Sequence, residues 1–387
     1  MIPFNGTDFF MLMAMFVILI SVCKLFMPSK FYRECLFVLN ASFLLVFYPD
    51  PALFFGFVLY SYFITWLFGK RFKLPLKIYG ILALLLPMLL VKFDIRFASF
   101  PFKLNYLLSF AGLSYACFRT MSLFMDKDPK SPMPDLLSYF NYLSFTPTML
   151  IGPIDRFQHF KKSQDSGFES ITTENFISGW YDLLKGIGFK YVLAEFIDRY
   201  WLNIYPSDSR ELVHMTNGMY AYYAYLFFDF AGYSAMAIGL GKMMGMTVPV
   251  NFTNPFLAVN PQDFWRRFHI SLGAWLKDYF FTPMFLWLSR FKSLKSWPMA
   301  KQNVCLAFTF LLMGCWNGFK LNFILSGLLF GIYSALHNWY VVQCRKKGKD
   351  IVFGKMSPAV VQIISIFIMI HLVAVSLYIF SGRCPLL

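Results

Sequence analysis

One histidine in this chain stands among charged residues inside an otherwise apolar sequence. His269 lies in the stretch FWRRFHISLGAWLKDYFF, residues 264–281, which also holds two arginines, a lysine and an aspartate. An imidazole titrates near neutral pH, so it can take or give a proton during a reaction. A histidine that only hydrogen-bonds a neighbouring helix would show the same spacing. Ionisable groups in a strongly apolar setting are costly, however, and they mark pathways or reaction centres. We therefore take His269 as the first candidate for acid/base chemistry.

A second polar group follows in the sequence MGCWNGFK, residues 313–320. Gly314 and Gly318 are four residues apart, which permits close contact with another helix. Asn317 lies between them, beside Trp316. A carboxamide cannot accept a proton at any useful pH, but its N–H groups can stabilise an oxyanion or orient a substrate. From residue 302 a helix would rise about 24 Å to Asn317, and the lysine at position 320 indicates water at that end.

The element that must position His269 is predicted to be one helix over residues 264–281, with Asp263 as its N-cap. Gly273, one turn after His269, is expected to leave open space beside the imidazole. Such a helix either lies flat at the membrane interface or packs obliquely in a bundle. Its broad apolar face carries Trp265, Phe268, Leu272, Trp275 and Tyr279, while Arg266, Arg267, Lys277 and Asp278 point largely elsewhere.

The composition places these residues in a membrane protein. Of 387 residues, 58% are hydrophobic and 14% are charged, which lies outside the range of soluble domains. Apolar runs of about 20 residues, the length that crosses a bilayer, recur along the chain. They predict an all-α integral membrane protein, one polytopic domain over residues 1–387, with about ten or eleven transmembrane helices. The runs cover roughly residues 9–26, 34–48, 52–69, 76–92, 105–125, 176–200, 216–247, 303–330 and 358–380.

Polar interruptions divide these runs. Residues 126–135 are predicted to form a loop, and residues 155–175 a loop with a short surface helix. Between them lie residues 136–152, where Pro147, Gly152 and the adjoining Pro153 favour a broken or re-entrant segment over a straight crossing. Asp229 is a single acid in an aromatic helix, and we expect it to pair with a basic residue. The sequence shows no internal repeat of the kind found in inverted-repeat transporters.

The net charge of +15 comes from basic residues in short loops between apolar runs. This distribution fits the positive-inside rule for cytoplasmic loops, so it does not indicate nucleic-acid binding. It also suits docking of an acidic partner or contact with anionic lipids. The seven cysteines show no spacing typical of metal ligands, and we interpret them as small core residues with no metal site.

Three motifs occur in an order that resembles membrane-bound O-acyltransferases, the MBOAT family. They are FFDFAGYSAMAIGLGKMMG, then VNFTNPF, then DFWRRFHISLGAWLKDYFFTP. The segments IGPIDRFQHF and IPFNGTDFF resemble the DltB-like branch, the D-alanyl transfer proteins of teichoic acid D-alanylation. The similarity covers nearly the whole chain, and the block over residues 227–283 is its most specific part.

The resemblance implies a conical bundle of helices around a central funnel in the bacterial cytoplasmic membrane. A hydroxyl acceptor would approach from outside, and an acyl thioester on the phosphopantetheine of a carrier protein would approach from the cytoplasm. The donor would be D-alanyl carrier protein, an acidic partner, and no cofactor would be bound to the chain itself. An extracytoplasmic membrane-anchored partner is a further expectation. Phe285 and Leu286 follow the motif where family members meet the carrier, although a surface turn against the bilayer would look identical.

This chain departs from the family at one position of the site. His269 matches the family's first histidine, but the second, in a tryptophan-histidine-glycine motif, is replaced by Asn317. That second histidine is expected to be the general base. His337 resembles another family histidine, but one continuous helix would put it about 30 Å from Asn317. His269 is therefore the candidate acid/base group and Asn317 the group that positions the acceptor or the oxyanion. Support for the reaction helix is expected from Trp265, Arg266, Trp275, Asp278 and Trp316.

Three interpretations of Asn317 remain open. His269 serves as the base with Asn317 as its polar partner, or the asparagine is an engineered replacement, or the chain has lost catalysis and keeps a binding role. The predicted function is transfer of a D-alanyl or other small acyl group to a hydroxyl of an envelope polymer or of a relay partner. The alternatives are an O-acetyltransferase for an exopolysaccharide and a non-catalytic scaffold or passage protein.

Overall fold

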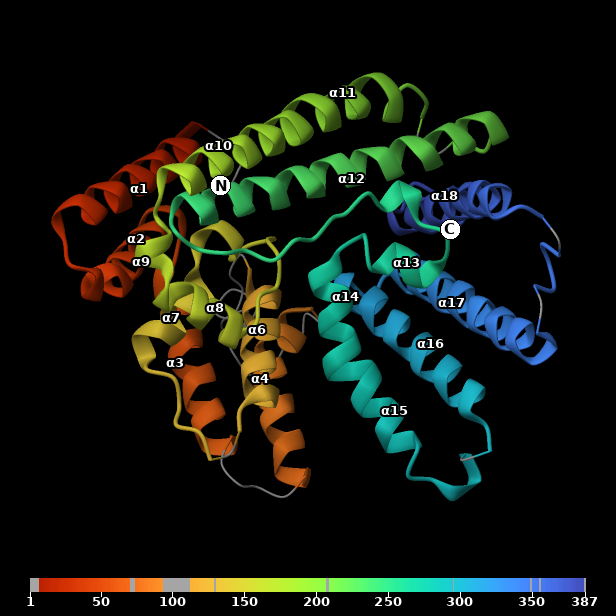
Figure 1. Ribbon diagram of the computed structural model, residues 1–387, viewed down its shortest axis with the longest axis horizontal. Coiled ribbons are helices and arrows are strands. Elements are labelled where there is room, and N and C mark those ends of the chain that lie inside the picture. Colours follow the sequence, from red (N-terminus) through yellow and green to blue (C-terminus); the bar gives the residue numbers. More distant parts are fainter. Residues whose placement is uncertain are drawn as a thin grey trace, which may run out of the picture. The chain divides into compact units, whose positions relative to one another are not determined.

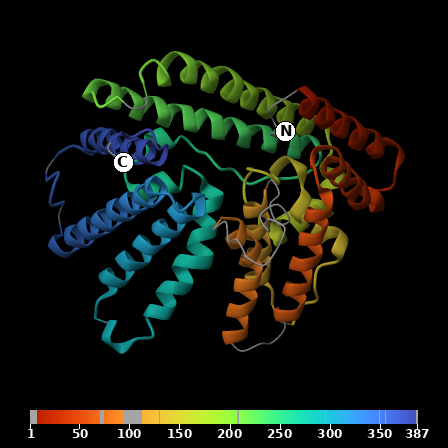
Figure 2. The same cartoon turned by 180° about the vertical axis from the view of Figure 1, so that it is seen from behind.

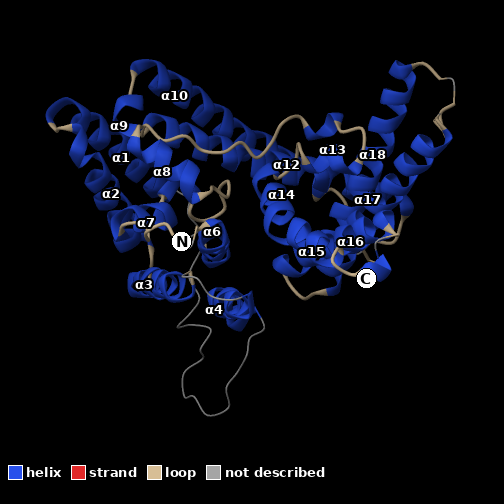
Figure 3. Ribbon diagram, turned by 60° about the horizontal axis from the view of Figure 1, so that its bottom comes forward, coloured by secondary structure: helices blue, strands red, loops and turns tan. Residues whose placement is uncertain are grey.

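Helices are the only regular secondary-structure elements in the part of the chain that the computed structural model describes (Figure 3). The single departure is an isolated antiparallel bridge between Phe252 and Phe268. The all-α prediction is therefore confirmed for the described residues. These are residues 7–69, 74–92, 112–128, 130–206, 209–294, 296–348, 350–354 and 356–385.

Two sets of residues form separate compact units, one of residues 1–187 with 232–249 and one of residues 188–231 with 250–387. The long helix α12, Leu212–Met243, contributes to both. The prediction of one domain over residues 1–387 concerns the membrane bundle as a whole and stays a prediction.

The first unit is built from helices of very different lengths (Figure 1). The α3–α4 and α4–α6 pairs pack side by side in both views (Figure 2). Its elements are α1 (Thr7–Phe26), η1 (Ser29–Phe31), α2 (Tyr32–Phe47), α3 (Pro51–Phe68), α4 (Leu74–Lys92), α6 (Leu113–Asp126), α7 (Leu136–Ser144), η2 (Thr146–Thr148), α8 (Phe157–Asp165), α9 (Gly167–Ser170) and α10 (Thr173–Ile187).

The second unit begins with two π-helical turns and ends in three long helices, of which α16 and α17 form an antiparallel hairpin (Figure 1). Its elements besides α12 are η3 (Gly188–Ala194), α11 (Glu195–Ile197), η4 (Asp198–Leu202), η5 (Pro255–Leu257), α13 (Pro261–Trp265), α14 (Ile270–Leu276), η6 (Lys277–Phe281), α15 (Thr282–Leu288), η7 (Lys292–Leu294), α16 (Pro298–Asn317), α17 (Leu321–Lys347) and α18 (Pro358–Phe380).

Three described helices are long and apolar enough to cross a bilayer: α1, α3 and α18. No more than 33% of each apolar stretch is buried inside the protein, so most of each surface is free to face lipid. The predicted number of ten or eleven spans and the central funnel stay predictions. Of the predicted apolar run 105–125, residues 105–111 lie outside the described residues, as do residues 70–73 of one basic loop and residues 2–6 of the amino-terminal motif.

Helix starts follow local sequence signals. The side chain of Asp135 accepts a hydrogen bond from the Ser138 N–H at 2.9 Å, which caps α7. Ser357 caps α18 in the same way, with Pro358 as the first helical residue. Capping side chains satisfy backbone donors that a helix leaves without partners at its first turn. These ends are therefore fixed by the sequence itself.

The predicted break in residues 136–152 is present. α7 ends at Ser144, a short 3₁₀ turn follows, and the chain stays non-helical until Phe157. Arg119, which is only 1% exposed, donates to the carbonyls of Tyr142, Leu143 and Thr148 at 3.1, 3.3 and 2.6 Å. These bonds satisfy carbonyls that the end of a helix would otherwise leave buried and unpaired. Arg119 thus explains how the chain around this break can be buried over residues 138–150.

Candidate active site

His269 lies at a sharp break between two short helices. α13 ends at Trp265, α14 begins at Ile270, and His269 has a left-handed backbone with φ 50° and ψ 49°. The prediction of one continuous helix over residues 264–281 is therefore wrong, and η6 and α15 complete the segment with a π-helical turn and a further helix. Left-handed conformations are uncommon outside glycine and occur at functional sites that the surrounding structure holds in place.

A strap of residues 250–254 holds this break. The Thr253 N–H donates to the Arg267 carbonyl at 2.9 Å, and the Ile270 N–H donates to the Asn251 carbonyl at 3.0 Å. The fully buried Asn251 also accepts from the Ser271 N–H through its side-chain oxygen, at 3.1 Å. These long-range bonds override the helical periodicity of the sequence. Sequence reasoning missed Asn251, and its signal was a polar residue between apolar ones in VNFTNPF.

The start of α13 is set by Asn260 rather than by the predicted Asp263. The Asn260 side chain accepts from the Asp263 N–H at 2.8 Å, and Asp263 accepts in turn from the Val259 N–H at 3.2 Å. Asp263 therefore occupies the third helical position of a capping box. Its carboxylate also accepts from Arg267 Nε at 2.9 Å and lies 3.7 Å from Arg266.

The imidazole of His269 is buried among aromatic rings. It is 6% exposed, meets the Phe230 ring edge-on at a centroid distance of 4.6 Å, and lies 6.4 Å from the Trp316 ring. Its Nδ1 has no hydrogen-bond partner among the described residues. A buried polar nitrogen without a partner is costly, and the prediction that it accepts a proton from a hydroxyl stays a prediction.

Asn317 is the last residue of α16, where the chain turns into α17. Its side-chain N–H donates to the Met313 carbonyl at 3.0 Å. A β-carbon added at Gly314 would lie 2.5 Å from the Phe323 carbonyl oxygen of α17, which confirms the predicted close helix contact. The structure brings Trp316 to His269. It shows no hydrogen bond between Asn317 and His269 in the described residues, so their pairing stays a prediction.

His337 lies on α17, far along the α16–α17 hairpin from Asn317. The helix is not continuous from Asn317, as the 30 Å expectation assumed, because α16 ends there and α17 runs back antiparallel. Asn338 donates to Asn303 at 2.6 Å. Since 14 residues separate positions 303 and 317 on α16, the level of His337 lies about 21 Å from Asn317. His337 is therefore not a substitute for the missing histidine.

The other predicted support residues divide into two groups. Trp265 packs between Phe310 and Phe330, at centroid distances of 5.4 and 4.9 Å. Trp275 is buried beside Tyr279, at 5.2 Å. Both tryptophans therefore anchor the short helices around His269. Arg266 is 73% exposed and Asp278 is exposed, so neither charged residue is buried in the packing around His269.

The expectation for Asp229 is confirmed, because it forms an ion pair with Lys190. The partner comes from the π-helical turn η3, whose Phe189 meets Phe228 edge-on at 5.2 Å. Phe230, the next residue after Asp229, carries the ring that contacts His269. The ion pair thus ties η3 to the part of α12 that walls the imidazole.

A cavity of about 630 Å³ opens beside this break. It is lined by α13, α14, η6, α16 and one residue of α17, so it runs between the His269 segment and the hairpin. Gly273 lines it, but an added β-carbon there would meet the Trp265 carbonyl at 3.2 Å. His269 is not among the residues that line this cavity, so the predicted open space beside the imidazole stays a prediction. The cavity lining is Gln262, Trp265, Arg266, Ile270, Gly273, Ala274, Leu276, Lys277, Phe281, Gln302, Leu306, Thr309, Phe310, Met313 and Ser334.

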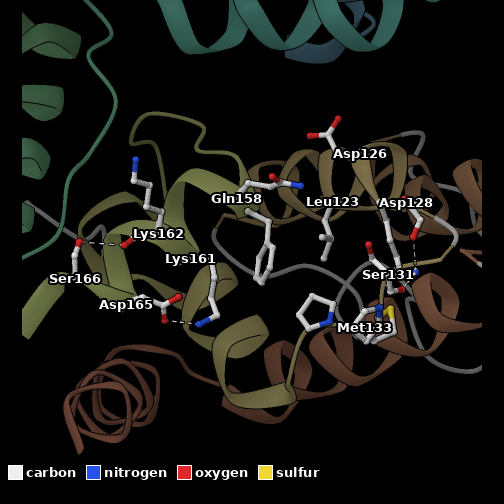
Figure 4. A pocket seen from close by; sticks show the side chains of 14 residues that line it. Leu123, Asp126, Asp128, Ser131, Met133, Gln158, Lys161, Lys162, Asp165 and Ser166 are labelled. Atoms are coloured by element: carbon white, nitrogen blue, oxygen red, sulfur yellow. Dashed lines mark hydrogen bonds and ion pairs between the residues drawn. The ribbon is translucent and has the colours of Figure 1, made fainter. Parts of the chain in front are cut away.

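A second cavity, of about 810 Å³, lies in the first unit between the end of α6, the loop after it and α8 (Figure 4). Three of its charged side chains have partners within the wall. Lys161 pairs with Asp165, and Lys127 donates to the Asp128 and Ser131 carbonyls. No histidine or cysteine lines it, so it offers no acid/base group near neutral pH.

The predicted carrier-contact residues lie on α15. Leu286 is 58% exposed, and Phe285 is half-buried. Beneath them the buried Lys301 donates to Ser289 Oγ at 3.2 Å and lies 5.4 Å from the centre of the Phe285 ring. α15 follows η6, which supplies Lys277 and Phe281 to the cavity lining. Contact with a carrier stays a prediction.

The sequence places the chain in a defined class of protein. Residues 60–380 match the model of MBOAT, the membrane-bound O-acyltransferase family. The chain belongs to this family, which confirms the resemblance, the membrane class and the acyltransferase class inferred from its motifs.

Three individual relatives show which acyltransferases this chain is similar to. The chain is 32% identical to the teichoic acid D-alanyltransferase of Bacillus subtilis, over 72% of this chain and 70% of the relative. It is 28% identical to the enzyme of the same name from Streptococcus thermophilus, over 77% of this chain and 73% of the relative. The peptidoglycan O-acetyltransferase of Helicobacter pylori is 34% identical over 54% of this chain and 39% of the relative.

Proposed function

We propose that this protein transfers a D-alanyl group, in the bacterial cytoplasmic membrane, to a hydroxyl of a teichoic-acid-type envelope polymer or of a relay partner. The donor is a thioester on the phosphopantetheine of an acidic carrier protein. Support comes from the D-alanyltransferases that match this chain over more than two thirds of both sequences, and from the cavity lined by Trp265 and Ile270 on either side of the break at His269.

That cavity is the observation on which the proposal depends. Along α16 its lining extends from Gln302 to Met313, a distance of about 17 Å at 1.5 Å per residue. Met313 is the residue whose carbonyl binds the Asn317 side chain. A cavity long in one direction suits a thin, flexible thioester arm. The cations Arg266 and Lys277 in its wall suit the phosphate of that arm.

The residues around the break have distinct roles in this reaction. His269 takes the proton of the acceptor hydroxyl while the oxygen attacks the thioester carbonyl. The carbonyl electron pair moves onto its oxygen and returns as the carbon–sulfur bond breaks, and the thiolate leaves with the proton from His269. Asn317 uses one N–H for Met313, and a carboxamide has a second N–H donor for the oxyanion.

The carrier docks on α15 in this proposal, with Phe285 and Leu286 as contacts. Exposed apolar side chains beside cations suit an acidic partner with an apolar contact face. The following turn supplies Arg290 and Lys292, both exposed. The same basic loops suit anionic lipids. A membrane-anchored partner outside the cytoplasm would receive or relay the acyl group.

A second candidate is O-acetyl transfer to a polysaccharide. The described residues that line the cavity include two cations and no carboxylate, so the wall offers no counter-ion for the ammonium of a D-alanyl group. An acetyl group needs none. Relatives named as O-acetylases or O-acetyltransferases also match, over smaller shares of their own length.

The test uses the full chain in proteoliposomes with carrier protein loaded with labelled D-alanyl or labelled acetyl thioester. We expect transfer of D-alanine to teichoic acid. Transfer of acetyl alone would establish the second candidate, and binding of loaded carrier without any transfer would indicate a scaffold. Either result would contradict the proposal.

A cavity-filling substitution tests the route of the donor. Ala274→Trp places a large ring into the cavity wall and is expected to reduce transfer by at least tenfold. Ala335→Trp, on the hairpin but outside the cavity lining, is the matched control. Equal activity of the two variants would show that the donor does not use this cavity.

A further inference from the structure

Three sulfur atoms meet where α1 turns into α2. Cys23 Sγ lies 3.5 Å from Cys35 Sγ, and Cys35 Sγ lies 3.8 Å from Met27 Sδ. The Met27 N–H bonds the Cys23 carbonyl at 2.8 Å, so the two side chains are one helical turn apart on the same face. The third sulfur comes from the first turns of α2. Ligands from two elements thus converge on one point.

These separations match those of sulfur ligands around a metal ion. With metal–sulfur bonds of about 2.3 Å, sulfur atoms lie about 3.8 Å apart in a tetrahedral site and about 4.0 Å apart in a trigonal one. A disulfide would require the two Sγ atoms to approach to about 2.05 Å, and it would give Met27 no role. We propose that Cys23, Met27 and Cys35 bind a soft monovalent metal ion of the copper(I) type.

The donor set selects for a soft ion. Thiolate and thioether ligands favour Cu(I), whereas thioether sulfur is not among the usual ligands of zinc. No group of three histidine, cysteine, aspartate or glutamate residues suited to a metal occurs in the searched, described residues. A harder divalent ion therefore has no complete ligand set here. From the sequence we interpreted all seven cysteines as small core residues. The proposed site makes Cys23 and Cys35 exceptions to that interpretation.

The three sulfur ligands are also accessible, and two basic residues lie near them in the sequence. Met27 is 38% exposed, and both cysteines are partly exposed, in contrast to Cys117 and Cys305, which are 0% exposed. Binding of Cu⁺ by two thiols releases two protons and leaves one net negative charge on the complex. Lys24 and Lys30 flank Met27 in the sequence, and Lys24 also donates to the Phe168 carbonyl at 2.7 Å and lies 3.8 Å from Glu169.

The test is a copper(I) competition titration of the reduced, full-length protein in detergent without oxygen, against a chromogenic copper(I) chelator. We expect one ion per chain. Cys23→Ser and Cys35→Ser should lose this binding, and Met27→Leu should weaken it by at least tenfold. Cys344→Ser, which changes a partly exposed cysteine on α17, should bind as the unmodified chain does.

X-ray absorption of the loaded protein should show three sulfur scatterers at about 2.3 Å. Met27 lies at an exposed turn, so Met27→Leu is expected to keep the thermal stability of the metal-free protein and separate ligand loss from misfolding. Uptake that is absent, that persists in Cys23→Ser, or that is unchanged in Met27→Leu would overturn the proposal. Nitrogen or oxygen scatterers in place of sulfur would overturn it as well.

Discussion

Two helix breaks in this protein differ in what their buried polar groups bind. At the break after α7, the two terminal nitrogens of Arg119 bind three backbone carbonyls, Asn40 accepts the Thr146 N–H at 3.1 Å, and Arg119 Nε has no hydrogen-bond partner among the described residues. At the break before α14, the strap satisfies the backbone, but His269 Nδ1 and Trp265 Nε1 have no hydrogen-bond partner in the described residues. Only the second break adjoins the cavity lined by Trp265.

From this difference we expect the first break to stabilise the fold and the second to bind the substrate. Buried polar atoms are nearly always hydrogen-bonded, so those left over need an explanation. Beside a cavity, the explanation is a group of the substrate or of the transition state. Substitutions at the first break should therefore change stability, and substitutions at the second should change catalysis.

Removing the imidazole gives the largest expected effect. His269→Ala should reduce acyl transfer by about 10²–10⁴-fold, the usual contribution of a general acid/base group. Transfer of labelled acyl groups in proteoliposomes measures it. His337→Gln is the matched control and should keep its activity. Equal transfer by His269→Ala and the unmodified chain would show that His269 at the second break has no catalytic role.

Removing the guanidinium at the first break should act on stability. Arg119→Met leaves buried carbonyls without donors and should lower the free energy of unfolding by about 2–4 kcal/mol. Thermal unfolding in detergent measures the change. Arg33→Met, which affects an exposed pair with Asp135, should cost less than about 1 kcal/mol. If Arg119→Met transferred acyl groups more slowly per folded molecule and kept its stability, the first break would have a catalytic role, against our expectation.

Loosening the strap should produce a mixed effect. Asn251→Ala removes the acceptor of the Ser271 N–H and should cost about 1–2 kcal/mol, with a fall in kcat larger than any change in KM because His269 loses its position. Asn251→Asp keeps a side-chain acceptor and should restore most of kcat. If both variants had the same kcat as the unmodified chain, the strap would not position the histidine.

The smallest expected effect is a pH-dependent change in the stability of the first unit. The Asp155 carboxylate accepts a hydrogen bond from His159 Nδ1 at 2.7 Å and raises the pKa of His159 above its ordinary value. The stabilising contribution of this bond is therefore complete below about pH 6.5, the pKa of an unperturbed histidine, and is lost as the pH rises through the higher pKa of the folded state. The difference in Tm between the unmodified chain and His159→Gln should shrink between pH 6 and pH 9. A constant difference would show that the pair does not titrate.

Sequence reasoning was most successful where local signals act alone. The broken segment after α7 follows from prolines and glycines, and the Asp229 ion pair follows from the cost of an unpaired charge. It failed at residues 264–281, where an apolar face predicted one helix. There the bonds from Asn251 to Ile270 and Ser271 connect residues about twenty positions apart, and periodicity contains no information about such contacts.

The candidate site shows the same limit. Its key residues, His269 and Asn317, could be selected from their types, and Gly314 predicted the close hairpin. The cavity wall could not be predicted from the sequence, because it combines residues of five elements whose packing depends on the break. Arg119 was missed for a related reason. Its role depends on the carbonyls of a helix end that the sequence does not show to be buried.

Asn317→His is the measurement that tests the central claim most directly, with transfer compared between this variant and the unmodified chain in the same proteoliposomes. The account predicts that the unmodified chain transfers acyl groups and that the variant is slower, because the second N–H of the carboxamide is lost at the oxyanion. An inactive unmodified chain that gains transfer in Asn317→His would contradict the account, since it would show that the native site lacks its base.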